Sequence, residues 1–204
     1  RSHYVDLDYY LSLNNEEILF TIGDYRQRYL AQDNDSLNGK IIKINLNSND
    51  YSIISKGHRN QQGLEYDINN DIILSTEHGP QGGDEINLII QGKVLKNYGW
   101  PIASYGEHYG GKESPNNIDL YKKYPLLKSH KDNGFEEPLL NFTPSIGISQ
   151  IVNIGKNKYS FASLKDKSLY FFELSDKKIK NLIRHEIGER IRDLDFHDDK
   201  LYLF

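Results

Sequence analysis

The strongest constraint on the fold is a series of short strand-like runs separated by Asn, Asp and Gly. Examples are "EILFTIGD", "GKIIKINLN", "KYSFASLKD" and "KSLYFFELSD". Aromatic and aliphatic residues dominate these runs, and turn pairs such as Asn69-Asn70 and Asp198-Asp199 fall between them. This pattern is typical of successive antiparallel hairpins. No long helical periodicity competes with it, so the chain is predicted to be all-β.

One pattern, an apolar strand, a turn with Asn or Asp and a second apolar strand, recurs along the chain. It occurs in "GLEYDINNDIILST" and "IRDLDFHDDKLYLF", and more weakly in "YLSLNNEEILFTIGD". Such recurrence favours a β-propeller, which uses ~40–45 residues per blade. We therefore expect residues 1–204 to form one incomplete propeller domain with four to five blades. A β-sandwich or an irregular β-barrel also fits the pattern.

The segment 97–141 breaks this rhythm, because it is rich in Gly, Pro, Tyr and charged residues and shows little alternation. Long loops on compact β scaffolds are often functional. We expect this segment to be a loop excursion over one end of the scaffold.

Composition excludes several classes of function. The formal net charge is -4 with no dominant basic run, which argues against nucleic-acid binding. No stretch approaches the ~18 apolar residues of a membrane span, and no signal peptide is recognisable. Cysteine is absent and the histidines are scattered, so a zinc site is not expected, even at His78. No nucleophile elbow or phosphate-binding glycine loop supports a hydrolase or a nucleotide-binding protein.

Three short segments carry candidate functional residues. Arg59, Asn60 and Gln62 place a cation and two amides within four residues, which suits a ligand rich in oxygen; a turn that satisfies its own backbone is the alternative. "EHGPQGGDE" could turn carbonyl and carboxylate oxygens toward a calcium ion, or it forms a tight solvated hairpin. In "ERIRD", a predicted strand, Arg190 and Arg192 should share one face, where an anion would relieve their repulsion.

Six segments in a fixed order carry a family resemblance: "AQDNDSLNGKIIKIN", "GHRNQQGLEYD", "EHGPQGGDEINLI", "GKVLKNYGWPIASYGEHYGG", "SLKDK" and "ERIRD". Together they resemble the soluble pyrroloquinoline-quinone (PQQ)-dependent enzymes of the glucose/sorbosone dehydrogenase family, and most of all the aldose sugar dehydrogenase branch. The resemblance runs from about Leu11 to the last residue. It implies a six-bladed propeller that binds PQQ and Ca²⁺, a periplasmic or extracellular location, and oxidation of an aldose at its anomeric carbon with hydride transfer to PQQ.

The resemblance also implies roles for individual residues. Those expected to bind the cofactor are Arg59, Asn60, Gln62, Lys165, Arg190 and Arg192. Arg59 would also be catalytic, because it would lie at the reactive quinone oxygens. Residues expected at metal sites are Gly79 and Pro80 for the calcium of the cofactor, and Glu85 and Tyr98 for a second, structural calcium.

The chain departs from the family at the catalytic base. The family has a histidine in a His-x-Gly-Gly-Arg type motif, and an ungapped count from "LFTIGD" places Asp6 at that position. His3 would substitute only after a shift of register. We therefore expect either an impaired dehydrogenase or a non-catalytic propeller, a binding module for a carbohydrate or protein partner or a structural subunit. Because four to five blades do not close a six-bladed ring, a second chain or an upstream segment would complete it.

Overall fold

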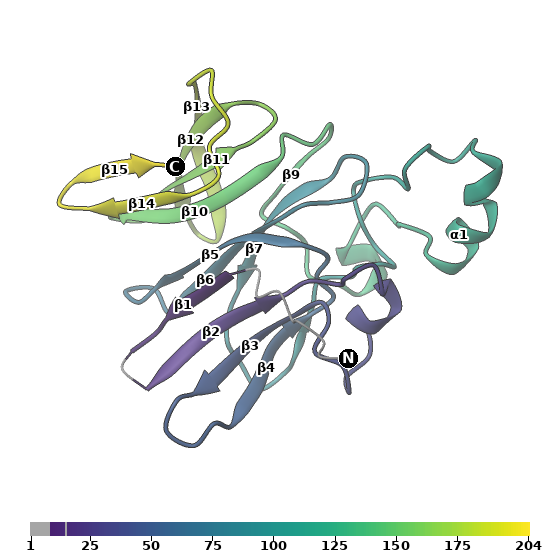
Figure 1. Cartoon of the computed structure of the whole chain (residues 1–204), viewed down its shortest axis with the longest axis horizontal. Coiled ribbons are helices and arrows are strands. Elements are labelled where there is room, and N and C mark those ends of the chain that lie inside the picture. The colour runs from purple at the N-terminus through teal and green to yellow at the C-terminus, as the bar shows by residue number, and fades with distance from the viewer. Residues whose placement is uncertain (1–8, 15) are drawn as a thin grey trace.

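The computed structural model describes residues 9–14 and 16–204, and within them the strands form four sheets (Figure 1). The first sheet contains β1 (Tyr9–Ser12), β2 (Glu17–Ile22), β3 (Lys40–Asn45), β4 (Tyr51–Lys56) and β8 (Lys96–Asn97). The second contains β5 (Gln61–Asp67), β6 (Ile72–Glu77), β7 (Asp84–Ile89) and β9 (Leu140–Phe142). The third contains β10 (Ile148–Gly155), β11 (Lys158–Ser163), β12 (Ser168–Ser175) and β13 (Lys178–Glu186). The fourth is the hairpin of β14 (Leu194–His197) and β15 (Lys200–Leu203).

Each sheet starts at its innermost strand and grows outward by antiparallel hairpins, and β8 and β9 are added at the outer edges of the first and second sheets. The innermost strands β1, β5, β10 and β14 lie next to one another in that order, so the sheets fan out from a common side (Figure 1). This is the arrangement of propeller blades. The prediction of an all-β fold is confirmed, and the described residues supply three blades of four or more strands and the inner hairpin of another.

Apolar side chains from facing sheets fill the spaces between the blades. Leu19 and Ile41 of the first sheet pack with Ile73 and Ile89 of the second, and all four have 0% exposure. Similar clusters lie between the second and third sheets and between the third sheet and the β14–β15 hairpin. Burial of these side chains, rather than hydrogen bonding between the blades, is expected to hold the fan together.

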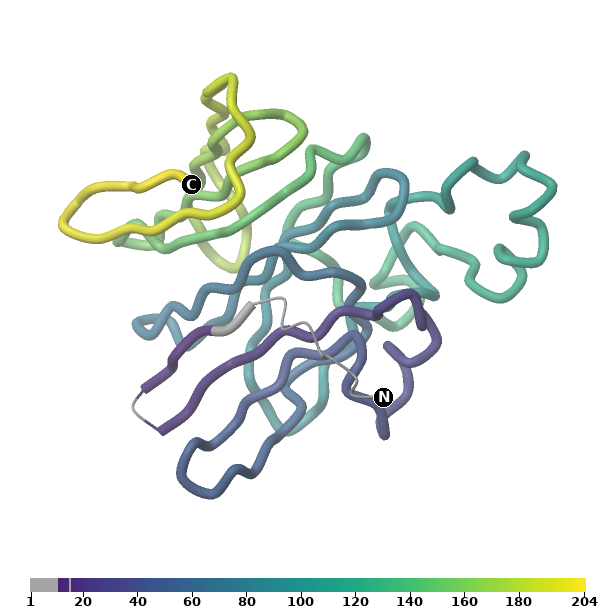
Figure 2. Tube along the Cα trace, viewed as in Figure 1, coloured from purple at the N-terminus to yellow at the C-terminus, as the bar shows by residue number. Residues whose placement is uncertain are grey.

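The chain crosses between two sheets before it enters the excursion. After β7 it runs to β8, which pairs in parallel with β4 of the first sheet, and it returns to the second sheet only at β9. Between them it forms a 3₁₀ turn (Pro115–Asn117), helix α1 (Ile118–Lys123) and another 3₁₀ turn (Lys131–Asn133). The part around α1, labelled in Figure 1, projects to the right in Figure 2. A further 3₁₀ turn (Arg28–Ala31) lies in the β2–β3 loop. Among the described residues no helix is long and apolar enough to cross a membrane.

The three recurring segments of the sequence correspond to the β1–β2, β5–β6 and β14–β15 hairpins, the inner pairs of three blades. One local prediction is wrong: "ERIRD" is not a strand but part of the loop 187–193 between β13 and β14. Its backbone bonds pair Arg192 and Asp193 with the chain end at Phe204 instead of with a ladder. Ile191 is nevertheless buried between exposed Arg190 and Arg192, so the alternation of side chains is kept.

Candidate cofactor and substrate site

Loops from all the sheets meet at the end of the fan where β5, β10 and β14 begin. They are residues 23–39, 57–60, 78–83, 143–147, 164–167 and 187–193. In a propeller, loops at one end of the blades gather around the axis although they are distant in sequence. This is where the predicted site residues Arg59, Asn60, Gly79, Pro80 and Lys165 lie.

Those five residues line one cavity of about 240 Å³, here called the Lys165 cavity. The rest of its lining is His78, Asp84, Tyr109, Ser145 and Gly147. Lys165 is exposed and Arg59 is half-buried, and among the described residues neither forms a salt bridge with a carboxylate. The buried Oγ atom of Ser145 has no hydrogen-bond partner within the part of the chain that the structure describes. Two cations and an unsatisfied hydroxyl on one cavity suit an anionic ligand rich in oxygen.

Asp84 holds two walls of this cavity together. It is 1% exposed, and its Oδ2 accepts hydrogen bonds from the backbone N–H groups of Gly147 (2.7 Å) and Ile148 (3.1 Å). Its Oδ1 accepts a longer bond from the N–H of Gly79 (3.3 Å). The carboxylate therefore fixes the β6–β7 loop against the β9–β10 loop.

His78 is a neutral wall of the cavity. Burial lowers the pKa of its imidazole, an effect that nearby Asp84 partly opposes. Because its Nε2 lies 2.7 Å from the carbonyl oxygen of Ile148, that nitrogen carries the proton and donates it. A neutral imidazole in this place does not compete with Arg59 and Lys165 for an anion.

Arg59 is oriented by neighbouring loops. Its Nη1 donates to the carbonyl oxygen of His78 (2.8 Å), and its guanidinium carbon lies 5.5 Å from the ring centroid of Trp100, within cation–π range. Trp100 Nε1 donates to Asp24 Oδ2 (2.8 Å), and Arg28 lies 5.4 Å from the same ring. The excursion thus reaches the site through its first residues.

The remaining predicted cofactor ligands do not line the Lys165 cavity. Gln62 is 7% exposed; its Nε2 donates to Asn60 Oδ1 (3.0 Å), and its Oε1 accepts from Arg192 Nη1 (2.7 Å). Arg192 is therefore connected to the cavity wall through two amides. Arg190 is exposed and forms no salt bridge among the described residues. Asp6 and His3, the residues in question for the base, lie outside the described residues.

Glu85 and Tyr98, expected at a second calcium site, are both buried, Glu85 on β7 and Tyr98 at the start of the excursion. Burial, reinforced by nearby Glu77, raises the pKa of the Glu85 carboxyl well above its ordinary value. Tyr98 donates its hydroxyl proton to the carbonyl oxygen of Leu88 (2.6 Å), and its ring stacks on His58. Glu85 Oε1 lies 3.5 Å from Nε2 of His130, which is long for a hydrogen bond.

Several buried polar atoms near Glu85 have no hydrogen-bond partner in residues 9–14 and 16–204. They are Asn87 Oδ1, Gln61 Nε2 and Oε1, and both ring nitrogens of His130. Such atoms are what a bound ion or water would satisfy. Among the described residues, however, no group of three or more His, Asp and Glu side chains has the geometry of a metal site. Calcium at either predicted position would therefore need backbone carbonyl and amide oxygens beside any carboxylate, and calcium accepts all of these.

A buried chain of side chains lies behind Arg59. Ser55 Oγ is 2.8 Å from His58 Nε2, and His58 Nδ1 is 3.0 Å from Glu77 Oε2. The connectivity is that of a hydrolase triad, but Ser55 and His58 have 0% exposure, so no substrate reaches the hydroxyl. These hydrogen bonds connect β4, the strand that precedes Arg59, to β6.

Sequence reasoning missed Asp84, Tyr109, Ser145 and Gly147 as lining residues. The local signal is the position of Asp84 at the end of the glycine-rich "EHGPQGGDE", a segment that predicts calcium ligands and does not predict a clamp between loops. Ser145 and Tyr109 carried no signal, because their place depends on how distant loops meet.

Comparison with known proteins defines the class. The family model described as Glucose / Sorbosone dehydrogenase matches residues 10–204. The chain is 30% identical over 199 residues to the aldose sugar dehydrogenase YliI of Escherichia coli strain K12, an alignment that covers 87% of this chain and 50% of that protein.

Solved structures give the same result for the fold. The soluble aldose sugar dehydrogenase from Escherichia coli, solved in its apo-form, matches with a TM-score of 0.76 and 27% identity, over 96% of this chain and 59% of that chain. An aldose sugar dehydrogenase from Streptomyces coelicolor, solved in its PQQ-bound form, shares the fold with a TM-score of 0.68 and 24% identity, over 92% of this chain and 52% of that chain.

The fold and the match together define a partial β-propeller of the sugar dehydrogenase class. The chain belongs to the glucose/sorbosone dehydrogenase family, as the motifs predicted, and it spans about half the length of the curated relatives it matches.

Proposed function

We propose that this chain is the cofactor-holding part of a PQQ-dependent sugar dehydrogenase that oxidises an aldose at its anomeric carbon. The observation that carries the proposal is the Lys165 cavity, where Arg59, Asn60, Gly79, Pro80 and Lys165 line one space although three loops supply them. Family membership and the PQQ bound by the Streptomyces coelicolor relative support the same cofactor.

The cavity suits the chemical character of PQQ and calcium. PQQ is a planar quinone with three carboxylates, and when bound it supplies the acceptor for the hydride from the sugar. Lys165 and Arg59 provide positive charge, and Ser145 provides a free hydroxyl. Gly79 packs so tightly that a Cβ there would lie 2.2 Å from the carbonyl oxygen of Gly83, so backbone oxygens crowd this corner, as a calcium site requires.

In the proposed reaction the sugar loses a hydride from C1 and a proton from the C1 hydroxyl, and a lactone results. Arg59 would stabilise negative charge at the acceptor oxygen, because its guanidinium is half-buried and held by the His78 carbonyl. Arg192, through Gln62, would fix Asn60 beside it. The proton requires a general base, and the family position for that base falls on Asp6.

The absence of a histidine at that position favours a second candidate, a propeller that binds PQQ, or a carbohydrate or protein partner, without turnover. Both candidates predict binding at the Lys165 cavity if PQQ is retained, and they differ in catalysis.

The experiment is to add PQQ and Ca²⁺ to the purified full-length protein and to measure both a thermal shift and reduction of a dye by a panel of aldoses. Stabilisation with dye reduction supports the dehydrogenase. Stabilisation without dye reduction supports the non-catalytic candidate. If PQQ and Ca²⁺ do not stabilise the protein, both proposals that involve the cofactor are contradicted.

A matched pair of variants tests the site. Arg59→Gln and Lys165→Gln should weaken PQQ binding about tenfold or more, as expected for loss of a charge-assisted hydrogen bond. Lys93→Gln removes one positive charge from an exposed position in the β7–β8 connection and should leave binding unchanged.

We also propose, from the family resemblance, a periplasmic or extracellular location, which cell fractionation tests. Completion of the ring by a second chain or an upstream segment is a further proposal. The exposed apolar groove on the third sheet, lined by Ile154, Phe171 and Ile183, supports it.

A further inference from the structure

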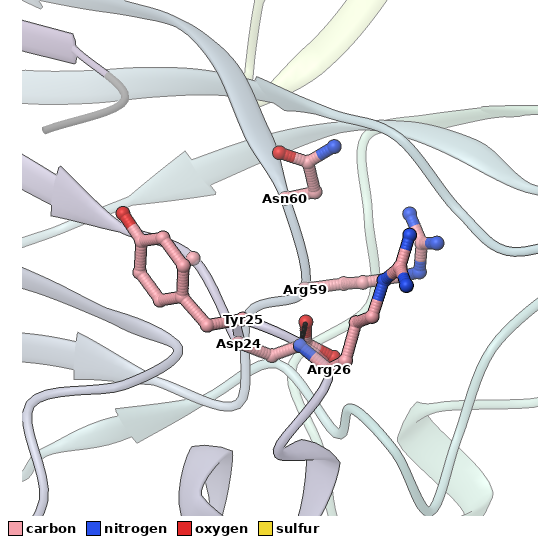
Figure 3. Close-up of a pocket in the computed structure, with 6 residues that line it drawn as sticks. Asp24, Tyr25, Arg26, Arg59 and Asn60 are labelled. Atoms are coloured by element: carbon pink, nitrogen blue, oxygen red, sulfur yellow. Dashed lines mark hydrogen bonds between the residues drawn. The ribbon is translucent and has the colours of Figure 1, made fainter. Parts of the chain in front are cut away.

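A second cavity adjoins the Lys165 cavity and shares Arg59 and Asn60 with it. It measures about 300 Å³ and is otherwise lined by Gly23, Asp24, Tyr25 and Arg26, so we call it the Arg26 cavity. In Figure 3 the guanidinium groups of Arg26 and Arg59 lie on one side of this cavity and the ring of Tyr25 on the other. Two cations from different loops thus face one space.

Among the described residues neither guanidinium forms a salt bridge, although the carboxylate of Asp24 lines the same cavity. Arg59 donates to a neutral carbonyl. Asp24 is the acidic side chain in the lining, but its Oδ1 accepts from the N–H of Arg26 (2.9 Å) and its Oδ2 from Trp100 Nε1 (2.8 Å). Like charges on one wall repel unless an anion lies between them.

A turn of the backbone at Tyr25 and Arg26 determines where the Arg26 side chain lies. Tyr25 and Arg26 both have positive φ, 48° and 62°, a region that side chains other than glycine rarely occupy. The same pairing of positive φ occurs in the tight hairpin turn at Asp198-Asp199, so Tyr25 and Arg26 form a tight turn of this kind. Here the bond from the Arg26 N–H to Asp24 turns the chain so that Arg26 lines the cavity.

The two cavities divide the site into two compartments. The Lys165 cavity contains Gly79, Pro80 and Lys165, the residues assigned above to the cofactor and its calcium. The Arg26 cavity contains none of these, and Arg59 and Asn60 form the boundary. A substrate that reacts with the cofactor at Arg59 would therefore occupy the Arg26 cavity.

We propose that this substrate is an anionic aldose, a sugar that carries a carboxylate or a phosphate away from C1, and that Arg26 binds this group. The inference rests on the proposed function, because it takes the adjoining cavity as the cofactor site. A guanidinium binds either anion with two parallel hydrogen bonds, which a neutral sugar hydroxyl does not match.

The test compares kcat/KM of the full-length protein, loaded with PQQ and Ca²⁺, for glucuronic acid, glucose 6-phosphate and glucose. We expect one of the anionic sugars to exceed glucose by about tenfold or more, with an advantage that falls as ionic strength rises. The better of the two identifies carboxylate or phosphate as the group recognised. Equal or better turnover of glucose overturns the proposal.

Variants assign the preference to Arg26. In Arg26→Gln the ratio of kcat/KM between the anionic and the neutral sugar should fall about tenfold, and Arg26→Lys should retain part of it. Because the ratio is measured within one enzyme, incomplete folding or cofactor loading cancels. The Lys93→Gln control should keep the wild-type ratio, and an unchanged ratio in Arg26→Gln overturns the assignment.

A binding measurement separates this inference from the proposed function. If no sugar is turned over, the dehydrogenase proposal fails, and titration calorimetry of glucuronate, glucose 6-phosphate and glucose still tests Arg26. Binding of an anionic sugar that is lost in Arg26→Gln supports the inference. Failure of both anionic sugars to bind the wild-type protein more tightly than glucose overturns it.

Discussion

Asp84 illustrates how the candidate site depends on side chains that never need to touch a ligand's reacting atoms. A buried carboxylate that accepts backbone N–H bonds from two loops sets the distance between those loops. The cationic residues of the site, by contrast, are half-buried or exposed and contribute little to stability by themselves.

Replacing Asp84 tests this role directly. Asp84→Ala leaves the N–H groups of Gly147 and Ile148 without their acceptor in a buried place, so we expect the free energy of unfolding to fall by about 2–4 kcal/mol. Asp84→Asn keeps one acceptor oxygen and should lose less. Chemical denaturation measures both, and the exposed Asp119→Ala on α1 is the control. A loss no larger than that of the control would contradict the clamp.

Glu65 on β5 provides a pH-dependent test. Burial raises the pKa of its carboxyl from an ordinary 4.5 to about 7. Between these values the folded state binds more protons than the unfolded state, so its contribution to stability is greatest below pH 4.5 and is lost as the pH rises to about 7.

Glu65→Gln removes this dependence. The difference in unfolding free energy between the variant and the wild type should shift in favour of the variant, on the order of 2 kcal/mol, from about pH 4.5 to about pH 7.5. Denaturation at both pH values measures it, with the exposed Glu113→Gln as the control. A difference that does not change with pH would show that folding does not raise the pKa of Glu65.

At the scale of elements, the hairpins follow from local sequence and the site does not. Alternating apolar residues around Asp198-Asp199 predict the β14–β15 turn, and both residues indeed adopt positive φ there. In "ERIRD" charged and apolar residues alternate in the same way, but no neighbouring strand pairs with this segment. An extended loop therefore cannot be distinguished from a strand by its sequence pattern alone. Asp84 and Ser145 were missed because their contacts join loops about sixty residues apart.

The β6–β7 loop carries the prediction at this scale. In Gly79→Ala the new Cβ would meet the carbonyl oxygens of Gly83 (2.2 Å) and Gly82 (2.4 Å), so the loop backbone must shift. We expect a loss of about 1–3 kcal/mol in stability together with weaker calcium-dependent PQQ binding. Gly92→Ala is the matched control, because no atom of the described residues lies within 4 Å of its Cβ. Equal PQQ affinity in the two variants would contradict the role of the loop.

At the scale of the whole molecule, the third sheet presents an apolar groove that a complete ring would cover. Ile183 on β13 is 51% exposed and lines this groove with Ile154 and Phe171. In a propeller the outer half of a blade packs on the next blade, whereas the β14–β15 hairpin reaches only the inner half.

Ile183→Asp distinguishes a covered groove from a free one. If further strands cover the groove in the full-length protein, the buried charge should reduce stability by several kcal/mol. If solvent fills the groove, the change should stay within about 0.5 kcal/mol, as expected for the control Val94→Asp, whose side chain is 73% exposed. Thermal or chemical denaturation of the full-length protein decides between these outcomes.

The crossing from β7 to β8 has a consequence for assembly during synthesis. Because β8 joins the first sheet before β9 completes the second, the ribosome must deliver residues up to Phe142 before the second blade can close. Until β9 is made, the outer strand β7 of the second blade has an unpaired edge. The outer strand β4 of the first blade is already covered by β8, which follows the second blade's β7 in the sequence. The crossing therefore connects the first blade to the second. After a protease cuts the excursion, the two fragments should stay associated, because β9 of the second fragment still pairs with β7 of the first.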